Sequence, residues 1–395
     1  MREMDFSESN LANRWLGVKG IWKLIEGEVK RLIKVRLERA LILEQRDCVG
    51  CGRYKRSKRR RGYRNGSYVR DLLTSYGWIE GLVVPRVREG GLDSFVLERY
   101  RRRQRQVDLV LLEAFLLGHS TRKVRRLFKR LFGDSVSAQT VSNIVKELDQ
   151  GVKQFHRRPL GDDYRFLYLD GIWVTLSKPV CVKKVLLIAL GVRRDGNKEL
   201  LGFQLASSES ESCWWGFLSD LKQRGLRGEN LEVIISDGAG GLVKAMEALY
   251  PRVAHQLCTF HKANDMGQHL VDKRHRHRII LDALYVFEGE TETEVRKRLK
   301  VFCDRWAPKE PQAVRNFVRG FEHCLVYLQY PDPLRTMLKT NNLLERYLQE
   351  LRRRIIPMRA FNNSKSVERI IYGLIAYVLN QQQDMPKTFT FTQLS

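Results

Sequence analysis

Between residues 165 and 262, short apolar runs alternate with polar turns, a pattern that is typical of β-strands separated by tight connections. Two stretches in this region instead carry apolar residues at helical spacing. The expected elements, in chain order, are strands at Phe166–Leu176, Val180–Arg193 and Glu199–Ala206, a helix at Ser210–Arg224, a strand at Glu232–Ser236, a helix at Leu242–Tyr250 and a strand at Val253–Cys258. The region therefore predicts an α/β fold with a mixed five-stranded sheet.

Two of these strands carry an aspartate where the apolar run stops, Asp170 in the first and Asp237 after the fourth. A carboxylate at the C-terminal tip of a buried strand contributes little to packing and is well placed to hold a metal ion. The order β-β-β-α-β-α-β is that of an RNase H-like domain, in which the first and fourth strands are neighbours. We therefore expect Asp170 and Asp237 to face each other across one edge of the sheet, where a divalent cation would relieve their repulsion.

After this region the apolar periodicity is helical to the end of the chain. Residues 263–338 lack strand signals and predict an all-helical insertion, and Thr340–Ile355 predicts the helix that returns Glu345 to the sheet. A further apolar helix is expected at Ser364–Gln382. Two strand-end aspartates and a helical glutamate form the arrangement that two-metal phosphoryl-transfer enzymes need. Each acid taken alone would equally fit a solvated carboxylate at the end of an element.

Before the sheet, three short helices are expected at Val107–Leu117, His119–Phe132 and Ser137–Leu148. Short helices with tight turns, a basic second helix and a polar third helix are typical of a helix-turn-helix module that binds DNA. An ordinary three-helix bundle would give the same pattern. The polar residues of the third helix that we expect to contact bases are Gln139, Ser142 and Asn143.

The first hundred residues are polar, rich in arginine and only patchily periodic. Runs of like charge are typical of a solvated or disordered arm, and such an arm can become ordered on DNA phosphates. The cations expected to contact phosphates are Arg53, Lys55, Arg56, Lys58, Arg59, Arg60, Arg61 and Arg64. Cys48 and Cys51 form a CxxC pair, but no second pair lies at finger spacing, so a closed zinc site with four ligands is not expected here.

Composition narrows the class of protein. The 395 residues are enough for two or three domains, and the net charge of +26 implies a polyanionic partner, most simply nucleic acid. No stretch approaches the roughly 18 apolar residues of a membrane span, and the N-terminus lacks a signal-peptide core. Seven scattered cysteines fit reduced thiols better than a disulfide framework. We therefore expect a cytoplasmic protein that has no membrane partner.

These patterns predict five consecutive regions. They are a basic DNA-contacting arm at 1–106, a helix-turn-helix-like DNA-binding domain at 107–155, the first part of an RNase H-like catalytic core at 156–262, an all-helical insertion at 263–338 and the C-terminal helices of the core at 339–395.

Short motifs from about Arg64 to Tyr377 occur in an order and spacing that resemble the bacterial IS256-like transposases, the prokaryotic relatives of Mutator-type transposases. The motifs are Arg64-Asn-Gly66, Val84-Pro-Arg86, Ser120-Thr-Arg122, Ser137-Ala-Gln-Thr-Val-Ser142, Tyr168-Leu-Asp170, Ser208-Glu-Ser-Glu-Ser212, Ser236-Asp-Gly238, Gln256-Leu-Cys258-Thr-Phe-His261 and Asn342-Leu-Leu-Glu345. The resemblance implies a DDE catalytic domain with a helical insertion, and it assigns Asp170, Asp237 and Glu345 to the catalytic triad.

The resemblance also implies a DNA transposase of an insertion sequence. Such an enzyme binds terminal inverted repeats and target DNA as a homo-oligomer, a dimer on DNA, and catalyses strand cleavage and strand transfer with two Mg²⁺ ions, for which Mn²⁺ can substitute. Oxygen-only ligands favour either ion over zinc. The further residues that the family motifs single out are Cys258, His261, Trp306, Asn342 and Arg352.

The family pattern is not followed everywhere. Leu348 stands where the family often has asparagine, and Asn264-Asp265 stands where it tends to have Arg-Asn. We expect Cys258 and His261 to pack or hydrogen-bond near the catalytic face, because two ligands cannot close a zinc site. For Trp306 a position in the core is favoured over stacking on an unpaired base.

Two other functions remain open at this stage. A structure-selective nuclease with the same fold would share the first chemical step. A non-catalytic DNA-binding regulator would explain the charge but not the three acids.

Overall fold

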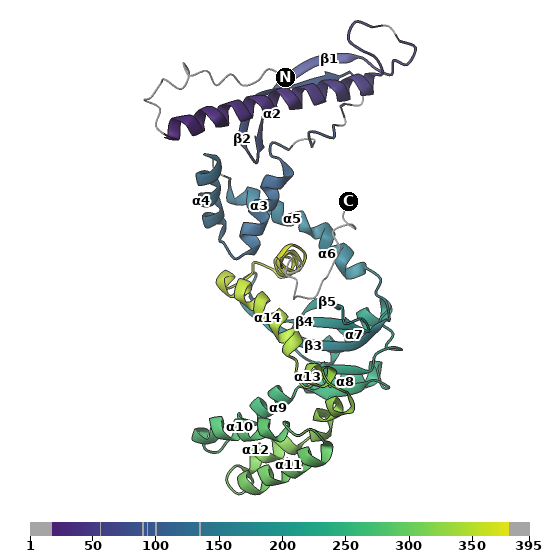
Figure 1. Cartoon of the computed structure of the whole chain (residues 1–395), viewed down its shortest axis with the longest axis vertical. Coiled ribbons are helices and arrows are strands. Elements are labelled where there is room, and N and C mark those ends of the chain that lie inside the picture. The colour runs from purple at the N-terminus through teal and green to yellow at the C-terminus, as the bar shows by residue number, and fades with distance from the viewer. Residues whose placement is uncertain are drawn as a thin grey trace. The chain divides into compact units, whose positions relative to one another are not determined.

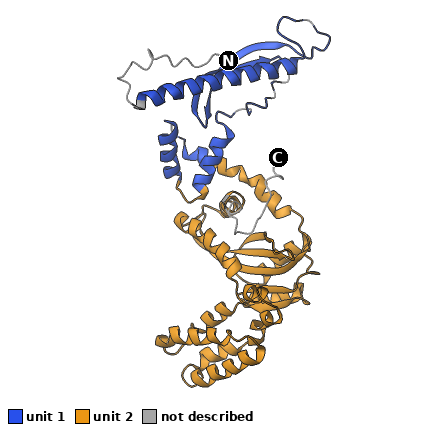
Figure 2. Ribbon diagram, viewed as in Figure 1, with its two compact units in different colours: residues 1–115, 121–141 blue, residues 116–120, 142–395 orange. Residues whose placement is uncertain are grey.

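The computed structural model of the chain describes residues 18–55, 57–88, 91–92, 94–98, 101–133 and 136–378. It divides into two compact units (Figure 2), one made of residues 1–115 and 121–141 and the other of residues 116–120 and 142–395. The boundary between them falls inside the segment 107–155, for which the sequence predicts a single DNA-binding domain.

The first unit begins with a long helix and a β-hairpin, neither of which is predicted from the sequence (Figure 1). The helix α2 spans Val18–Val49, and the strands β1 (Arg64–Thr74) and β2 (Gly77–Val87) pair antiparallel around a turn in which Gly77 has a φ of 101°. A small apolar cluster joins the helix to the hairpin, and it consists of Leu41, Leu72, Leu82, Val84 and Leu97. The sequence analysis missed α2 because apolar residues lie both on the side that packs on the hairpin and on an exposed side, so no single apolar face stands out.

The helices predicted after the hairpin are confirmed, with one difference. They are α3 (Arg105–Leu116), α4 (Thr121–Phe132) and α5 (Ala138–Lys146). A separate helix α6 follows at Leu148–Arg157, in a stretch for which the sequence predicts no further helix.

The second unit is built on the predicted five-stranded mixed sheet, with strand order β5-β4-β3-β6-β7. The strands are β3 (Tyr164–Leu176), β4 (Val182–Arg193), β5 (Lys198–Ala206), β6 (Val233–Ser236) and β7 (Ala254–Leu257). β3, β4 and β5 pair antiparallel, whereas β6 is parallel to both β3 and β7. The prediction that the first and fourth strands are neighbours is therefore confirmed.

Two helices, α7 (Glu211–Gln223) and α8 (Gly240–Leu249), cover one face of this sheet. Leu167 and Leu169 of β3 belong to the core that these helices make with the sheet. Because side chains alternate along a strand, Asp170 must face away from that core.

From β7 to residue 341, all of which the structure describes, the chain forms helices and no strand. The helices are α9 (Thr259–Met266), α10 (Arg276–Val286), α11 (Glu292–Trp306), α12 (Pro311–Val318) and α13 (Leu334–Leu338), with short 3₁₀ turns between them. They enclose an apolar core of their own, which includes Phe287, Phe302, Phe317 and Phe321. Gln256 of β7 joins this segment to the sheet, because its side chain donates to Cys324 O (3.1 Å) and accepts from Tyr327 N (2.9 Å).

The chain then returns toward the sheet through α14 (Asn342–Ile355), which buries Leu344, Tyr347, Leu348 and Leu351. It ends in α15 (Ser364–Gly373) and a π-helical turn at Leu374–Val378. The last four residues of the helix predicted at Ser364–Gln382 lie outside the described residues. No helix in the described part of the chain has the length and apolar content that crossing a membrane requires.

Candidate active site

Asp170 does not lie at the tip of a strand, which is where its place at the end of the first apolar run suggested that it would lie. It lies inside β3, which continues for six residues and pairs with β4 to its end, at Leu176↔Val182. The apolar alternation resumes after Gly171, and β3 ends at Leu176, as the predicted strand Phe166–Leu176 does. Asp170 nevertheless lies beyond the point where β6 stops, because the last β3–β6 pair is Tyr168↔Ile235.

Asp237 directly follows β6, in the turn before α8. Its Oδ1 accepts a hydrogen bond from Ala239 N at 3.1 Å, and this bond fixes the start of the turn. Asp170 and Asp237 each lie two residues beyond the pair Tyr168↔Ile235, so the parallel register brings them to the same level of the sheet. Burial, and then the negative charge of Asp237, raise the pKa of Asp170 to about 6.

Glu345 lies in the first turn of α14, where the positive end of the helix dipole favours an anion. Its Oε1 is 3.3 Å from Nε2 of His261, which α9 supplies. The neighbouring Cys258 thiol, and then the charges of Asp170 and Glu345, raise the pKa of His261 to about 9 against the effect of its burial. The imidazolium therefore offsets part of the negative charge of Glu345 and Asp170.

Asn341, the residue before α14, connects these elements and was missed by the sequence analysis. Its Nδ2 donates to Asp170 Oδ2 (3.1 Å), its backbone N–H donates to Cys258 Sγ (3.3 Å), and its carbonyl accepts from Glu345 N (2.9 Å). An asparagine at a helix N-cap usually accepts a bond from the first turn, but this side chain makes no such cap. The only signal in the sequence that could have pointed to Asn341 as a site residue is its position next to the family motif that begins at Asn342.

Two more acids lie near Asp237. Burial, and then the charge of Asp237, raise the pKa of Glu209, and burial together with Asp237 also raises the pKa of Asp265. Arg352, which the sequence analysis singled out, acts in the opposite direction and lowers the pKa of Asp170. The site therefore carries an excess of negative charge, which a bound cation would offset.

The residues present fit a divalent cation. The carboxylates of Asp170, Asp237 and Glu345 are hard oxygen donors, and Asn341 Oδ1 is buried without a hydrogen-bond partner. Among the described residues, the group of potential ligands whose donor atoms all lie within 4.8 Å of one another is Cys258, His261 and Glu345. Asp170 and Asp237 are not members of that group.

The other residues that the family motifs single out have diverse surroundings. Trp306 is 4% exposed and packs in the core of the helical segment, where its Nε1 donates to Asp282 Oδ2 at 2.9 Å. Asn342 is exposed at the first position of α14, and Leu348 is buried on the inner side of that helix.

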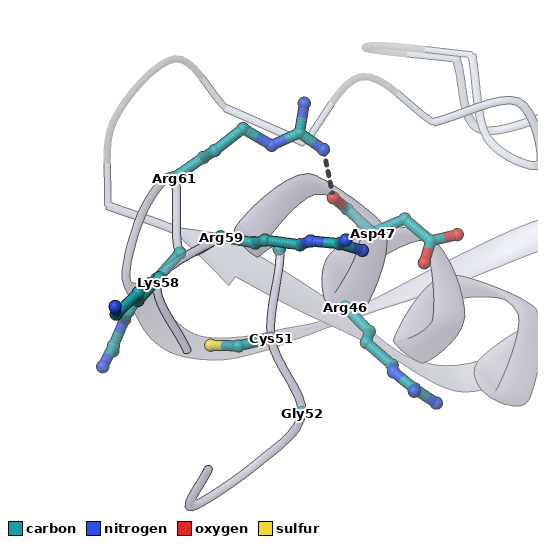
Figure 3. Close-up of a pocket in the computed structure, with 9 residues that line it drawn as sticks. Arg46, Asp47, Cys51, Gly52, Lys58, Arg59 and Arg61 are labelled. Carbon is teal, nitrogen blue, oxygen red and sulfur yellow. Dashed lines mark hydrogen bonds between the residues drawn. The ribbon is translucent and has the colours of Figure 1, made fainter. Parts of the chain in front are cut away.

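The expected DNA contacts of the first unit lie mainly in the loop between α2 and β1. Six of the cations are exposed there, namely Arg53, Lys55, Lys58, Arg59, Arg60 and Arg61, whereas Arg56 is outside the described residues. Lys58, Arg59, Arg60 and Arg61 line a cavity of about 740 Å³ together with Arg46 (Figure 3). The loop is tied to α2, because Arg61 N–H donates to Val49 O at 2.8 Å and the Arg61 guanidinium donates to Asp47 O at 2.9 Å.

Arg64 differs from these cations, because its guanidinium is used within the unit. It donates to Gln45 Oε1 (3.2 Å) and to Cys51 O (2.6 Å), and so fastens the start of β1 to the end of α2. On α5, the predicted base-contacting residues Gln139, Ser142 and Asn143 are all exposed.

Comparison with known proteins identifies the family. A sequence model described as "Transposase, Mutator family" matches residues 13–384, which is most of the chain. The chain belongs to the Mutator family of transposases. The family resemblance inferred from the motifs is therefore confirmed.

Several transposases of bacterial insertion sequences are similar to this Mutator-family chain over most of its length. The transposase for insertion sequence element ISRM5 of Rhizobium meliloti is 31% identical over 88% of this chain and 86% of its own length. The transposase for IS256 in transposon Tn4001 of Staphylococcus aureus is 32% identical over 89% and 90%, respectively. The transposase for IS1081 of Mycobacterium tuberculosis is 32% identical over 83% and 79%.

Proposed function

We propose that this chain is the transposase of an insertion sequence, which binds the terminal inverted repeats of its element and catalyses DNA cleavage and strand transfer by a DDE two-metal mechanism. Its catalytic domain would be RNase H-like, with the helices between β7 and α14 as an insertion. The observation that supports this most is that Asp170 and Asp237 lie at the same level of two adjacent parallel strands, with Glu345 3.3 Å from His261, whose charge also acts on Asp170. Membership of the Mutator family supports the same reading.

Asp170, Asp237 and Glu345 would hold the metal ions, with Mg²⁺ as the favoured ion and Mn²⁺ as its substitute. When bound, such ions activate an attacking oxygen and stabilise the leaving 3′ oxygen in an in-line displacement. The protein's own residues keep the ligands in place. His261 orients Glu345 at 3.3 Å, and Asn341 holds Asp170 through a bond of 3.1 Å.

The DNA would be bound by the part of the chain before about residue 155. The exposed cations Lys58, Arg59 and Arg60 would contact phosphates, and the exposed face of α5 would contact bases. The proposed specific partner is the double-stranded inverted repeat, since phosphate contacts alone would bind any DNA.

A nuclease with the same fold is the alternative, because water attacks the first phosphodiester in both reactions. The two functions separate in the second step, in which the freed 3′-OH attacks a new phosphodiester. We would therefore incubate the full chain with Mg²⁺, a labelled element end that already carries a free 3′-OH, and a plasmid target.

The proposal predicts covalent joining of the labelled end to the plasmid, and loss of joining in Asp237→Asn. Cleavage of intact DNA without joining of the pre-cut end would favour the nuclease. DNA binding with neither reaction would favour a regulator.

A further inference from the structure

One side of α2 carries apolar residues that nothing in the described residues covers. Ile21, Ile25, Leu32, Val35 and Ile42 are 47%, 43%, 58%, 39% and 57% exposed, respectively. Their spacing, with Glu28 and Arg39 completing the series, alternates between three and four residues, as in the seam of a coiled coil. We call these seven residues the α2 seam.

The seam and the contacts with the hairpin lie on different sides of α2. On the hairpin side, Lys34 Nζ donates to Glu80 O (3.0 Å), Glu38 Oε1 accepts from Val83 N (2.9 Å), and Leu41 is fully buried. At 100° per residue, the centre of the seam lies about 120° around the helix from the centre of these three positions, and Ile42 comes nearest to the hairpin side, about 40° from Glu38. Packing within the helix–hairpin pair therefore accounts for one side of α2 and leaves the seam without a partner.

We propose that the α2 seam is a self-association surface, on which α2 of a second copy of this chain packs antiparallel. The charges decide the orientation. When two seams run antiparallel and are centred between Leu32 and Val35, Leu32 lies opposite the partner's Val35, and Glu28 lies opposite the partner's Arg39. The same arrangement places Ile25 opposite the partner's Ile42, whereas Ile21 lies opposite the partner's Arg46, beyond the end of the partner's seam.

A parallel arrangement would place Glu28 opposite Glu28 and Arg39 opposite Arg39, two like-charge contacts inside an apolar seam. Glu28 already pairs with Arg31 at 2.8 Å, but both side chains are more than half exposed, so this pair is weak and can be exchanged. An antiparallel contact is also symmetric about a two-fold axis, which closes the assembly at two copies.

This inference gives the expected homo-oligomer a surface, and it does not depend on the metal chemistry of the proposed function. It can therefore be tested with the full chain in the absence of DNA and metal. Sedimentation and light scattering over a range of concentrations, at about 0.15 M salt where close charge pairs are only partly screened, should show a monomer that converts into a dimer.

Leu32→Glu should weaken the dimer at least about a hundredfold, because it replaces two buried leucines by charges. The matched control Val69→Glu changes an equally exposed apolar residue of the hairpin and should leave the dimer unchanged. Glu28→Arg and Arg39→Glu should each weaken it about tenfold. Their combination should return it to within about threefold of the parent, because each new charge then faces its opposite.

Four results would overturn the proposal. They are a parent chain that stays monomeric at every concentration, a dimer that Leu32→Glu leaves intact, a combined variant that is no better than its components, and a Leu32→Glu chain that unfolds at a lower temperature than the parent when both are dilute monomers. The last result would mean that the seam packs against its own chain.

Discussion

The five-stranded sheet of the second unit and the helix–hairpin pair of the first unit differ in where their apolar and charged groups lie. In the sheet, Leu167, Leu169, Leu187 and Ile234 are at most 1% exposed, and Asp170 is partly buried on the other side of β3. In the first unit the apolar cluster is small, the cations are exposed, and one side of α2 is apolar and open. The sheet buries these apolar residues within its own unit. The helix–hairpin pair instead exposes apolar and positively charged surfaces that could bind other molecules. We infer that chemistry is assigned to the first of these regions and recognition to the second.

Removing a carboxylate near the sheet is the most direct test of whether the chemistry takes place in this region. Asp170→Asn, Asp237→Asn and Glu345→Gln should each reduce cleavage and joining at least about a thousandfold, because each removes a proposed metal ligand. Affinity for inverted-repeat DNA should be unchanged or higher, since a negative charge is lost. Glu247→Gln, an exposed carboxylate of α8, is the control and should retain activity. Equal cleavage by the parent and any of the three variants would remove that residue from the site.

The enclosed charge also predicts an effect on stability. Because the pKa of Asp170 is about 6 in the folded chain and 3.8 without perturbation, folding favours its protonated form. The resulting penalty is absent below about pH 4, grows as the pH rises, and is complete above about pH 6, where it reaches about 3 kcal/mol at most.

Asp170→Asn should therefore raise the thermal unfolding temperature of the metal-free chain at pH 8 and not at pH 4. Adding Mg²⁺ at pH 8 should stabilise the parent more than the variant. A variant that is less stable than the parent at pH 8 in the absence of metal would contradict the electrostatic account of the site.

DNA binding by the first unit can be tested by measuring how the affinity depends on salt concentration. Changing Lys58, Arg59 and Arg60 to glutamine should weaken binding of inverted-repeat and unrelated DNA alike, by roughly tenfold. The slope of log affinity against log salt should fall by about 0.9 for each lost phosphate contact. The matched control changes three exposed lysines of the second unit, Lys273, Lys297 and Lys300. If the two triple variants lose the same affinity, binding is not centred on the loop between α2 and β1.

The smallest expected effect concerns Asn341 and its neighbour. Asn341→Ala removes the hydrogen bond to Asp170 and should raise the Mg²⁺ concentration for half-maximal joining by about threefold to tenfold, since one bond to a charged group is lost. Activity at saturating Mg²⁺ should be largely recovered. Asn342→Ala, at the adjacent exposed position, should leave the Mg²⁺ requirement unchanged. If Asn342→Ala raised the Mg²⁺ requirement and Asn341→Ala did not, Asn341 would not position Asp170.

The two regions also differ in how far their structure could be predicted. The apolar runs between residues 165 and 262 predicted the five strands, because buried strands leave a strong periodic signal, and the order of the elements predicted that the first and fourth strands are neighbours. The end of β3 was predicted correctly at Leu176, but Asp170 was treated as a strand tip although the strand continues past it. Asn341 could not be predicted, because its contacts depend on how the chain enters α14. Arg64 was predicted to contact DNA because it belongs to a basic run. The sequence does not show that its guanidinium hydrogen-bonds to Gln45 and Cys51.

The central claim is that Asp170, Asp237 and Glu345 together hold the catalytic metal ions. Electron paramagnetic resonance of Mn²⁺ added to the full chain in complex with a pre-cut element end tests it most directly, because it counts bound ions without requiring turnover. We predict about two saturable Mn²⁺ ions per site, as in two-metal enzymes, which Mg²⁺ displaces. Asp237→Asn should lose them and Glu247→Gln should keep them. The same number of bound ions, at the same affinity, in the parent and in Asp170→Asn, Asp237→Asn and Glu345→Gln would contradict the account.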